Sequence, residues 1–173
     1  MGNDGKIDKD AVKLTLRPFE DADIALMERW LYVPHVARWY KHPGHWLDEL
    51  RQRHGAFSFL THFIAEVEGA PIGFCQYYDT FYAQAHEVWG DEWDVREKPG
   101  SIFSIDYLIG EAAYLRRGFG RQMILQMLKR LQTAGAKTVI VEPEEENAAS
   151  GGALTACGFV WDGKGYHKAL EKN

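Results

Sequence analysis

The hydrophobic positions of this chain follow two periods in turn, and this predicts a domain that mixes strands and helices. Leu14 and Leu16 recur at the period of a half-buried strand, whereas Ile24, Met27 and Leu31 recur at helical spacing. The same two periods continue to the end of the chain. The expected strands are 12–19, 59–67, 71–78, 102–109, 138–142, 159–162 and 166–170, and the expected helices are 21–32, 46–53, 118–134 and 148–157.

Local turn and cap signals separate these elements. Glu68 and Gly69 lie between two strand patterns, which indicates a hairpin. Asp21 is expected to cap the first helix, and Asn147 is expected to cap the helix that starts at residue 148. Gly158, followed by an apolar residue, is typical of a helix C-terminus.

Composition limits the class of protein. At 173 residues and 46% hydrophobic side chains, we expect a flexible polar tail over 1–11 and one globular domain over 12–173. No apolar run approaches the roughly 20 residues of a membrane span, the first residues lack a signal-peptide core, and neither cysteine has disulfide or metal spacing. These features predict a cytoplasmic protein that does not bind membranes. The net charge of −5 argues against nucleic acid and permits a cationic small molecule. A monomer and a homodimer both remain open.

A basic, glycine-rich turn joins the strand 102–109 to the helix 118–134. Gly118 and Gly120 allow close approach to the backbone, and Arg116, Arg117 and Arg121 add positive charge. The start of the helix offers free N–H groups and the positive end of the helix dipole. This arrangement suits a phosphate group.

The turn resembles the acyl-CoA-binding motif of the GNAT superfamily of N-acetyltransferases, although Leu115 stands where the family has Arg or Gln. The order of expected elements is similar to that of the family over nearly the whole chain. The resemblance implies an α+β GNAT fold, with a mixed sheet of about seven strands and about four flanking helices. It also implies acetyl-CoA as cosubstrate and no metal. The implied CoA-binding residues are Tyr107, Leu108, Ile109, Arg116, Arg117, Gly118, Phe119, Gly120, Arg121 and Asn147.

Within the superfamily, the chain is similar to the aminoglycoside 6′-N-acetyltransferases. The similarity is carried by segments 36–40, 70–78, 104–108 and 115–120. It implies transfer of an acetyl group to a primary amine, most directly the 6′-amine of an aminoglycoside. Other amines, such as a siderophore precursor or a protein N-terminus, remain open. So does a CoA-binding module without turnover.

Asp106 is the candidate base. It is a carboxylate inside an otherwise apolar strand, where it costs free energy unless it is paired or used. An outward-facing or salt-bridged aspartate is the alternative. The resemblance implies that Asp106 accepts the proton of the amine or positions that amine.

The segment 79–100 has six acidic side chains against two basic ones, together with several aromatic side chains. A surface of this kind suits a polycation, since carboxylates attract ammonium groups and rings pack on sugars. The alternative is a solvated cover over the core. The expected acceptor-binding residues are Trp39, Tyr40, Tyr77, Trp89, Asp91, Glu92, Trp93 and Asp94.

One position departs from the family. Many GNAT enzymes carry a tyrosine four residues before the glycine that ends the last helix, where it protonates the leaving thiolate. Leu154 occupies that position here. Tyr166, a water molecule or unaided departure of the thiolate are the alternatives. His42 and His45 lie close together without further ligands, so we expect no metal site there.

Overall fold

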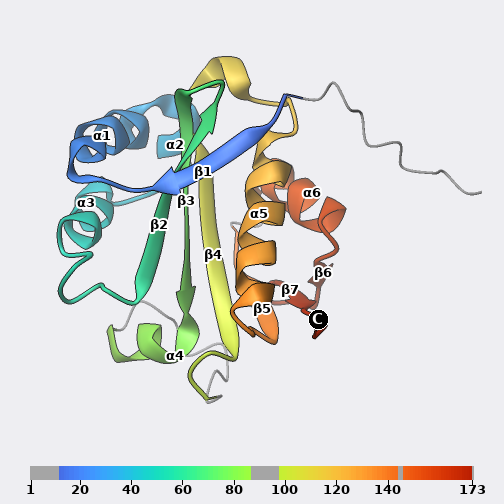
Figure 1. The fold of residues 1–173 in the computed structure, drawn as a ribbon. Helices are drawn as coiled ribbons and strands as arrows, with labels where there is room; N and C mark the ends of the chain where they lie inside the picture. The colour runs from blue at the N-terminus through green and yellow to red at the C-terminus, as the bar shows by residue number, and fades with distance from the viewer. Residues whose placement is uncertain (1–11, 87–97, 144–145, 173) are drawn as a thin grey trace, which may run out of the picture.

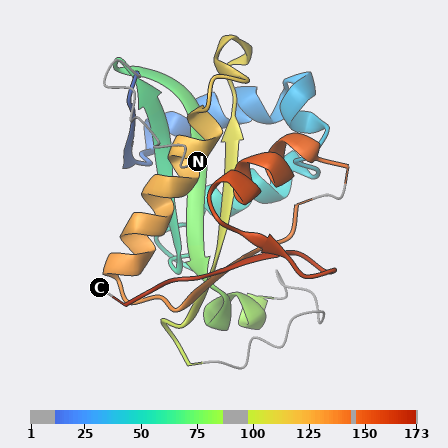
Figure 2. The same ribbon diagram turned by 90° about the vertical axis from the view of Figure 1, so that its right-hand side faces the viewer.

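The computed structural model describes residues 12–86, 98–143 and 146–172. These residues form one mixed sheet with helices on both faces, as Figures 1 and 2 show. The strand order is β1-β2-β3-β4-β5-β7-β6, and only the β4–β5 pair is parallel. The strands are β1 Leu14–Pro18, β2 Leu60–Val67, β3 Ala70–Asp79, β4 Ile102–Ile109, β5 Thr138–Val141, β6 Val160–Trp161 and β7 Tyr166–Ala169.

The helices divide between the two faces of the sheet. α1 (Ile24–Tyr32), α2 (Pro34–Ala37) and α3 (Pro43–Arg51) cover one face, and α5 (Phe119–Thr133) and α6 (Ala148–Ala156) cover the other (Figure 1). α4 (Thr80–Ala83) follows β3 directly. Three 3₁₀ turns occupy 21–23, 84–86 and 112–114. The GNAT fold expected from the sequence is therefore confirmed. The one-turn helices α2 and α4 were not expected, and α4 lies within the segment 79–100, for which the sequence predicted no helix or strand.

The structure contains most of the predicted turns and helix caps, and the cap of the first helix is the exception. Glu68 and Gly69 both have positive φ, 51° and 79°, as a tight hairpin turn requires. Asp21 does not cap α1, since its carboxylate pairs with Arg53 at 2.5 Å. The 3₁₀ turn 21–23 that precedes α1 is capped instead through Asp23, whose carboxylate accepts a hydrogen bond from the backbone N–H of Glu20 at 2.8 Å.

Among the described residues, the two largest hydrophobic cores lie on opposite faces of the sheet and hold the layers together. Phe119, Met123 and Met127 of α5 pack with Ile105 of β4 on one face, and Leu154 of α6 lies in the same core. On the other face, the helices α1 and α3 pack on β2, β3 and β4 around the fully buried indole of Trp30. Both cysteines are buried as free thiols, as expected. Among the residues described, no helix is long and apolar enough to cross a membrane.

The site depends on a divergence between β4 and β5. The two strands pair only from Ile102–Thr138 to Ser104–Ile140. Beyond that point β4 continues to Ile109 and remains paired with β3 alone. One edge of β4 over residues 105–109 is therefore left without a neighbouring strand, and the sheet opens there.

The close approach of Gly110 to Trp30 gives a stability prediction. A Cβ added at Gly110 would lie 2.1 Å from the Trp30 ring, whereas one at Gly44 in α3 would meet nothing. We expect Gly110→Ala to lower the free energy of unfolding by about 1–3 kcal/mol, because Trp30 is fully buried and cannot move aside. Gly44→Ala should leave stability unchanged or raise it by up to about 1 kcal/mol. Equal denaturant midpoints for the two variants would contradict this packing.

Candidate active site

The free edge of β4 carries the first part of the site. The backbone N–H of Gly110 donates to the carbonyl oxygen of Ile72 at 2.8 Å. Because hydrogen-bonded pairs alternate along an antiparallel ladder, the backbone groups of Tyr107 and Ile109 point away from β3. Side chains from the α2 region contact both carbonyl oxygens on this edge. The Tyr40 hydroxyl donates to that of Tyr107, and His35 Nε2 lies 2.8 Å from that of Ile109.

The N-terminus of α5 forms the second part. Gly118 is the N-cap with φ of 80°, a conformation that L residues other than glycine rarely adopt. Arg116 also has positive φ, 59°. A Cβ at Gly118 or Gly120 would meet nothing within 4 Å, so the space above this helix start is open. The free N–H groups and the helix dipole therefore face an accessible volume with an arginine on either side.

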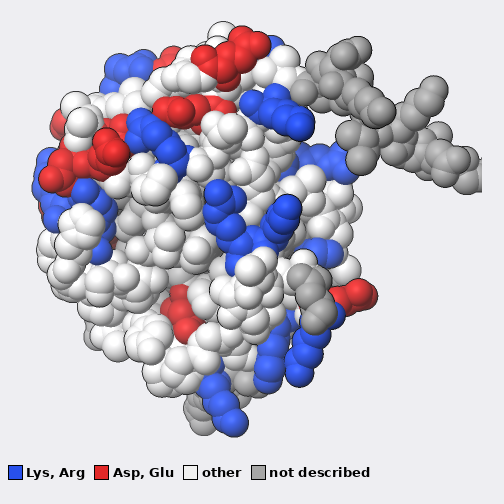
Figure 3. Space-filling model, viewed as in Figure 1, with Lys and Arg blue, Asp and Glu red and all other residues white. Residues whose placement is uncertain are grey.

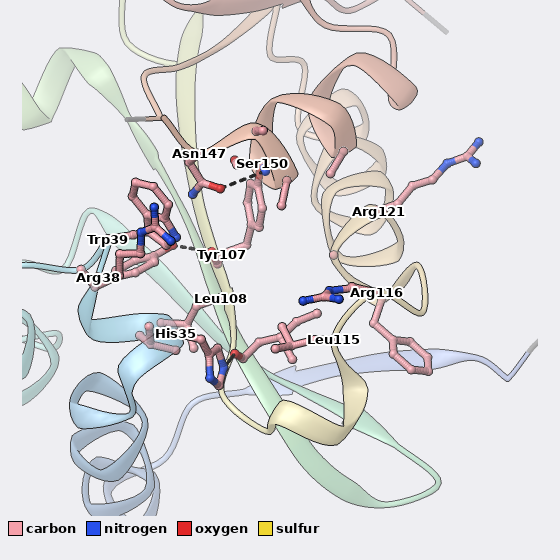
Figure 4. Close-up of a pocket in the computed structure, with 18 of the residues that line it drawn as sticks. His35, Arg38, Trp39, Tyr107, Leu108, Leu115, Arg116, Arg121, Asn147 and Ser150 are labelled. Atoms are coloured by element: carbon pink, nitrogen blue, oxygen red, sulfur yellow. Dashed lines mark hydrogen bonds between the residues drawn. The ribbon is translucent and has the colours of Figure 1, made fainter. Parts of the chain in front are cut away.

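The first turn of α6 forms the third part. Asn147 caps the helix as predicted, because its Oδ1 accepts the Ser150 N–H at 3.1 Å. The Ser150 hydroxyl lies 2.5 Å from the Tyr107 hydroxyl, so β4 and α6 are joined across the opening of the sheet. Figure 4 shows Tyr107 and Ser150 side by side, with Asn147 next to them.

These three parts surround one cavity of about 650 Å³. This volume lies within the usual range for small-molecule sites. The structure brings almost all of the residues predicted to bind CoA to its wall: Tyr107, Leu108, Ile109, Arg116, Gly118, Phe119, Gly120, Arg121 and Asn147. Figure 3 shows basic side chains extending down the α5 side of the molecule.

Arg117 is the exception among the predicted CoA-binding residues. Its guanidinium packs over the rings of Tyr114 and Phe119 at 5.2 and 5.3 Å, and it does not line the cavity. The sequence placed it in the turn correctly. It could not show that an aromatic pair would draw this side chain away, whereas Arg116 and Arg121 remain at the wall.

Asp106 lies on the opposite face of β4 from Tyr107. Its Oδ2 accepts a hydrogen bond from Gln76 Nε2 at 2.8 Å, and the two residues are register partners on β4 and β3. Burial raises the pKa of the Asp106 carboxyl to about 6, and the Gln76 hydrogen bond acts against this increase. Its side chain is still partly exposed. The carboxylate is therefore ionised at neutral pH, is more basic than an ordinary aspartate and makes no salt bridge among the described residues.

Other polar groups lie near Asp106. Burial, and then the charge of Asp106, raise the pKa of Glu49 on α3 to about 7. Burial also raises the pKa values of Tyr40 and Tyr78 well above their usual range, and the Asp106 charge adds to this effect. The side of β4 that faces α3 therefore carries two carboxyl groups with two tyrosines near them.

The residues expected to bind the acceptor separate in the structure. Trp39 and Tyr40 line the cavity beside the free β4 edge. Tyr77 does not belong to this group, because the alternation of β3 turns Gln76 toward Asp106 and Tyr77 toward the opposite face. There its ring packs 5.8 Å from Phe63. Trp89, Asp91, Glu92, Trp93 and Asp94 lie outside the described residues.

The sequence did not predict several residues of the site, among them Glu49, Gln76 and Ser150. Gln76 could have been found as a polar side chain inside an apolar strand. Glu49 and Ser150 gave no comparable signal, because a glutamate on a surface helix and a serine in a first helical turn are ordinary. Among the residues described, no group of three or more His, Cys, Asp or Glu side chains could hold a metal ion.

An open strand edge and a helix N-terminus therefore face one cavity on an α+β fold, and the partly exposed carboxylate of Asp106 lies on the same strand. The family model for the GNAT acetyltransferase domain matches residues 20–165. The chain therefore belongs to the GNAT acetyltransferase family, and it is an acetyltransferase that uses acetyl-CoA.

Curated relatives and solved structures agree with this family. The chain is 25% identical to the aminoglycoside N(6′)-acetyltransferase type 1 of Klebsiella pneumoniae, over 87% of this chain and 75% of that protein. It is 31% identical to the mycothiol acetyltransferase of Frankia casuarinae, over 76% of this chain and 37% of that protein. A crystal structure of aminoglycoside acetyltransferase AAC(6′)-Ib with coenzyme A and kanamycin superposes with a TM-score of 0.75 at 23% identity, covering 91% of this chain and 95% of that one.

Proposed function

We propose that the cavity between β4, α5 and α6 holds acetyl-CoA and that an amine reacts at the β4 edge beside Asp106. One observation carries the proposal: an open helix N-terminus and an unpaired strand edge face the same cavity. The helix start at Gly118, with Arg116 and Arg121, suits a pyrophosphate. The free N–H groups of Tyr107 and Ile109 suit the carbonyl groups of a peptide-like arm.

Bound acetyl-CoA supplies the activated acetyl group, and the residues of this chain supply the proton chemistry. Asp106 accepts a proton from the amine, and its raised pKa makes it a stronger base than an ordinary aspartate while it stays ionised at neutral pH. Gln76 holds one carboxylate oxygen and so fixes its direction. Tyr40 donates to the Tyr107 carbonyl and holds this stretch of β4 against α2.

The acceptor we propose is a primary amine on an aminoglycoside, the 6′-amine in the first instance. The K. pneumoniae relative is an aminoglycoside N(6′)-acetyltransferase, which supports this choice. Asp106 and Glu49 give the α3 side of β4 a negative character, and the acidic side chains of segment 79–100 add to the negative charge of the chain. Such a surface attracts a molecule with several ammonium groups.

A second acceptor class is an amine that also carries an anionic group. Arg38 favours it, because its exposed guanidinium stacks 4.6 Å over the Trp39 ring at the wall of the cavity. A siderophore precursor or a peptide N-terminus with a nearby carboxylate would fit this charge. Kanamycin, a polyamine, a peptide and an amino acid hydroxamate, each tested with acetyl-CoA, would distinguish the two classes.

The first test of the proposal is a substitution at the start of α5. Gly118→Asp places a negative charge where we expect the pyrophosphate, and Gly118→Asn is the matched control because it has nearly the same shape and the same positive φ. We expect Gly118→Asp to weaken acetyl-CoA binding at least about tenfold more than Gly118→Asn does, since like charges meet at the helix start. Isothermal titration calorimetry measures the difference. Equal dissociation constants for the two folded variants would show that this turn does not bind the pyrophosphate.

The second test is the pH dependence of turnover. Asp106 must be ionised to accept a proton, so we expect kcat to fall as the pH drops through about 6. Asp106→Asn should lower kcat by roughly 10²-fold or more, leave acetyl-CoA binding unchanged and abolish this acidic limb. Gln76→Leu should move the limb to higher pH, because it removes a hydrogen bond that stabilises the ionised carboxylate.

Glu49→Gln is the control for this assignment, since Glu49 also titrates near neutral pH. The acidic limb should persist in Glu49→Gln. A limb that disappears with Glu49 and survives in Asp106→Asn would assign the base to Glu49 instead.

The third test concerns the acceptor. A variant with Asp91→Asn, Glu92→Gln and Asp94→Asn should raise the KM for kanamycin more than it lowers kcat, because uniform electrostatic attraction acts on ground and transition states alike. Added salt should raise the wild-type KM in the same direction by screening. A control variant neutralises three exposed carboxylates elsewhere, Glu28, Glu68 and Glu171, and should change KM by less than about twofold. If no aminoglycoside is acetylated, the substrate class is wrong while the acetyltransferase activity stands.

A further inference from the structure

A sulfur that leaves as a thiol rather than as a thiolate needs a proton, and the position that supplies it in many GNAT enzymes cannot do so in this chain. Leu154 has no ionisable group, and its side chain is fully buried in the core between the sheet, α5 and α6. Any hydroxyl that serves this purpose must therefore come from another position on the cavity wall.

Tyr166 does not fill this role. A Cβ added at Gly151 would lie 2.6 Å from the Tyr166 hydroxyl, so that hydroxyl is close against α6. The residue lines an adjoining surface hollow together with Pro143 and Trp161. This hollow shares Asn147, Ala148 and Ala156 with the 650 Å³ cavity, but Tyr166 itself does not line that cavity. The alternative that the sequence left open at Tyr166 is therefore not supported by its position.

Three of the described residues that line the cavity carry a hydroxyl group, Tyr40, Tyr107 and Ser150. The Tyr40 hydroxyl donates its hydrogen to the Tyr107 carbonyl oxygen, so Tyr107 and Ser150 remain as candidates. Tyr107 lies next to Asp106 on β4 but on the opposite face, and Ser150 lies one helical turn before Leu154 on α6. Their oxygen atoms are 2.5 Å apart, and both residues line the cavity (Figure 4). Tyr40 holds the Tyr107 backbone, and the Asn147 cap holds that of Ser150, so the pair is fixed from both sides.

The hydrogen count of this pair leaves one proton available. Each hydroxyl has a single hydrogen, and one hydrogen is enough to join the two oxygens. Within the described part of the chain, neither hydroxyl has another hydrogen-bond partner. If Ser150 donates to Tyr107, the Tyr107 hydrogen is free to point into the cavity. Burial raises the pKa of Tyr107 well above its usual value, so the phenol keeps its hydrogen at neutral pH.

We propose that Tyr107, held by Ser150, is the proton donor to the departing sulfur, in place of the tyrosine that Leu154 replaces. This role rests on the proposed position of the acetyl-CoA arm along β4. The two proton-handling groups, Asp106 and Tyr107, are then consecutive residues that act from opposite faces of one strand.

The amine nitrogen forms a bond to the acetyl carbon while the carbon–sulfur bond breaks, and the electron pair of that bond remains on sulfur. The Tyr107 hydroxyl gives its proton to sulfur, and the Ser150 hydroxyl stabilises the phenolate by donating to it. Asp106 takes the proton that the nitrogen loses. Solvent at the open cavity then returns one proton to Tyr107, and solvent that reaches the partly exposed Asp106 removes one from its carboxyl, so both groups are restored.

The experiment compares Tyr107→Phe with Tyr166→Phe, which makes the same chemical change at the tyrosine outside the cavity. We expect Tyr107→Phe to lower kcat by roughly 10²-fold, the lower end of the range for general acid catalysis, and Tyr166→Phe to change it less than about twofold. Ser150→Ala should lower kcat by about tenfold, and Ser150→Thr, which keeps the hydroxyl, should restore most of it. Dissociation constants for CoA and acetyl-CoA should stay within about threefold throughout, because the arm and phosphate contacts remain.

A second readout does not depend on turnover. A hydroxyl that donates to sulfur stabilises the thiolate, so the ultraviolet absorbance of CoA bound to the protein should reach half-ionisation about one pH unit lower in wild type than in Tyr107→Phe. Unchanged kcat and an unchanged thiol titration in Tyr107→Phe would overturn the proposal. So would an equal loss in Tyr166→Phe. If Gly118→Asp also leaves CoA affinity unaltered, the position of the arm itself is wrong, and that failure is separate from the failure of the proton donor.

Discussion

The parting of β5 from β4 is the constraint on which the site depends. β5 has four residues and Pro143 follows soon after it, whereas β4 has eight. Only three register pairs join them before the sheet opens. An unpaired edge inside a protein must find other partners for its backbone groups. Here Tyr40 and His35 contact the carbonyl oxygens of Tyr107 and Ile109 on that edge. The hydrogen bond between the Tyr107 and Ser150 side chains connects the same strand to α6. The site therefore lies where the hydrogen bonding between β4 and β5 ends, and side chains replace the missing strand for only some of the backbone groups on that edge.

The alternation of side chains along β4 then places a carboxylate on one face of the strand and a phenol on the other. Asp106 points toward α3 and Gln76, in surroundings that favour its protonated form, while Tyr107 points toward α6 and the cavity. Because neighbouring residues of a strand face opposite sides, the two groups share a backbone position without contacting each other. In the proposed mechanism this alternation places the base, Asp106, on the α3 face of β4 and the proton donor, Tyr107, on the face that lines the cavity.

Much of this arrangement follows from local sequence. The hairpin at Glu68–Gly69, the Asn147 cap and the Gly118 turn are set by residues close together in the chain, and each was predicted. Tyr77 was expected among the acceptor-binding residues, but the face of the sheet on which its side chain lies depends on the register between β3 and β4. The strand period shows that Gln76 and Tyr77 face opposite ways, but not which of them meets Asp106. Glu49 depends similarly on how α3 docks against the sheet, and Arg117 on an aromatic pair that forms only after folding. Long-range packing, rather than local preference, decided all three positions.

Two carboxyl groups, Asp106 and Glu49, lie close together on the α3 side of β4. Asp106 and Glu49 are close enough for the charge of one to raise the pKa of the other, and burial raises both. Among the described residues, neither accepts a hydrogen bond or ion pair from a lysine or arginine. Ionising both therefore costs free energy, and a nearby cation lowers this cost. An ammonium group would favour the ionised form of Asp106 at the moment when a base is required. A neutral amine would leave the pair partly protonated, so the charge of the acceptor itself would help to prepare the base.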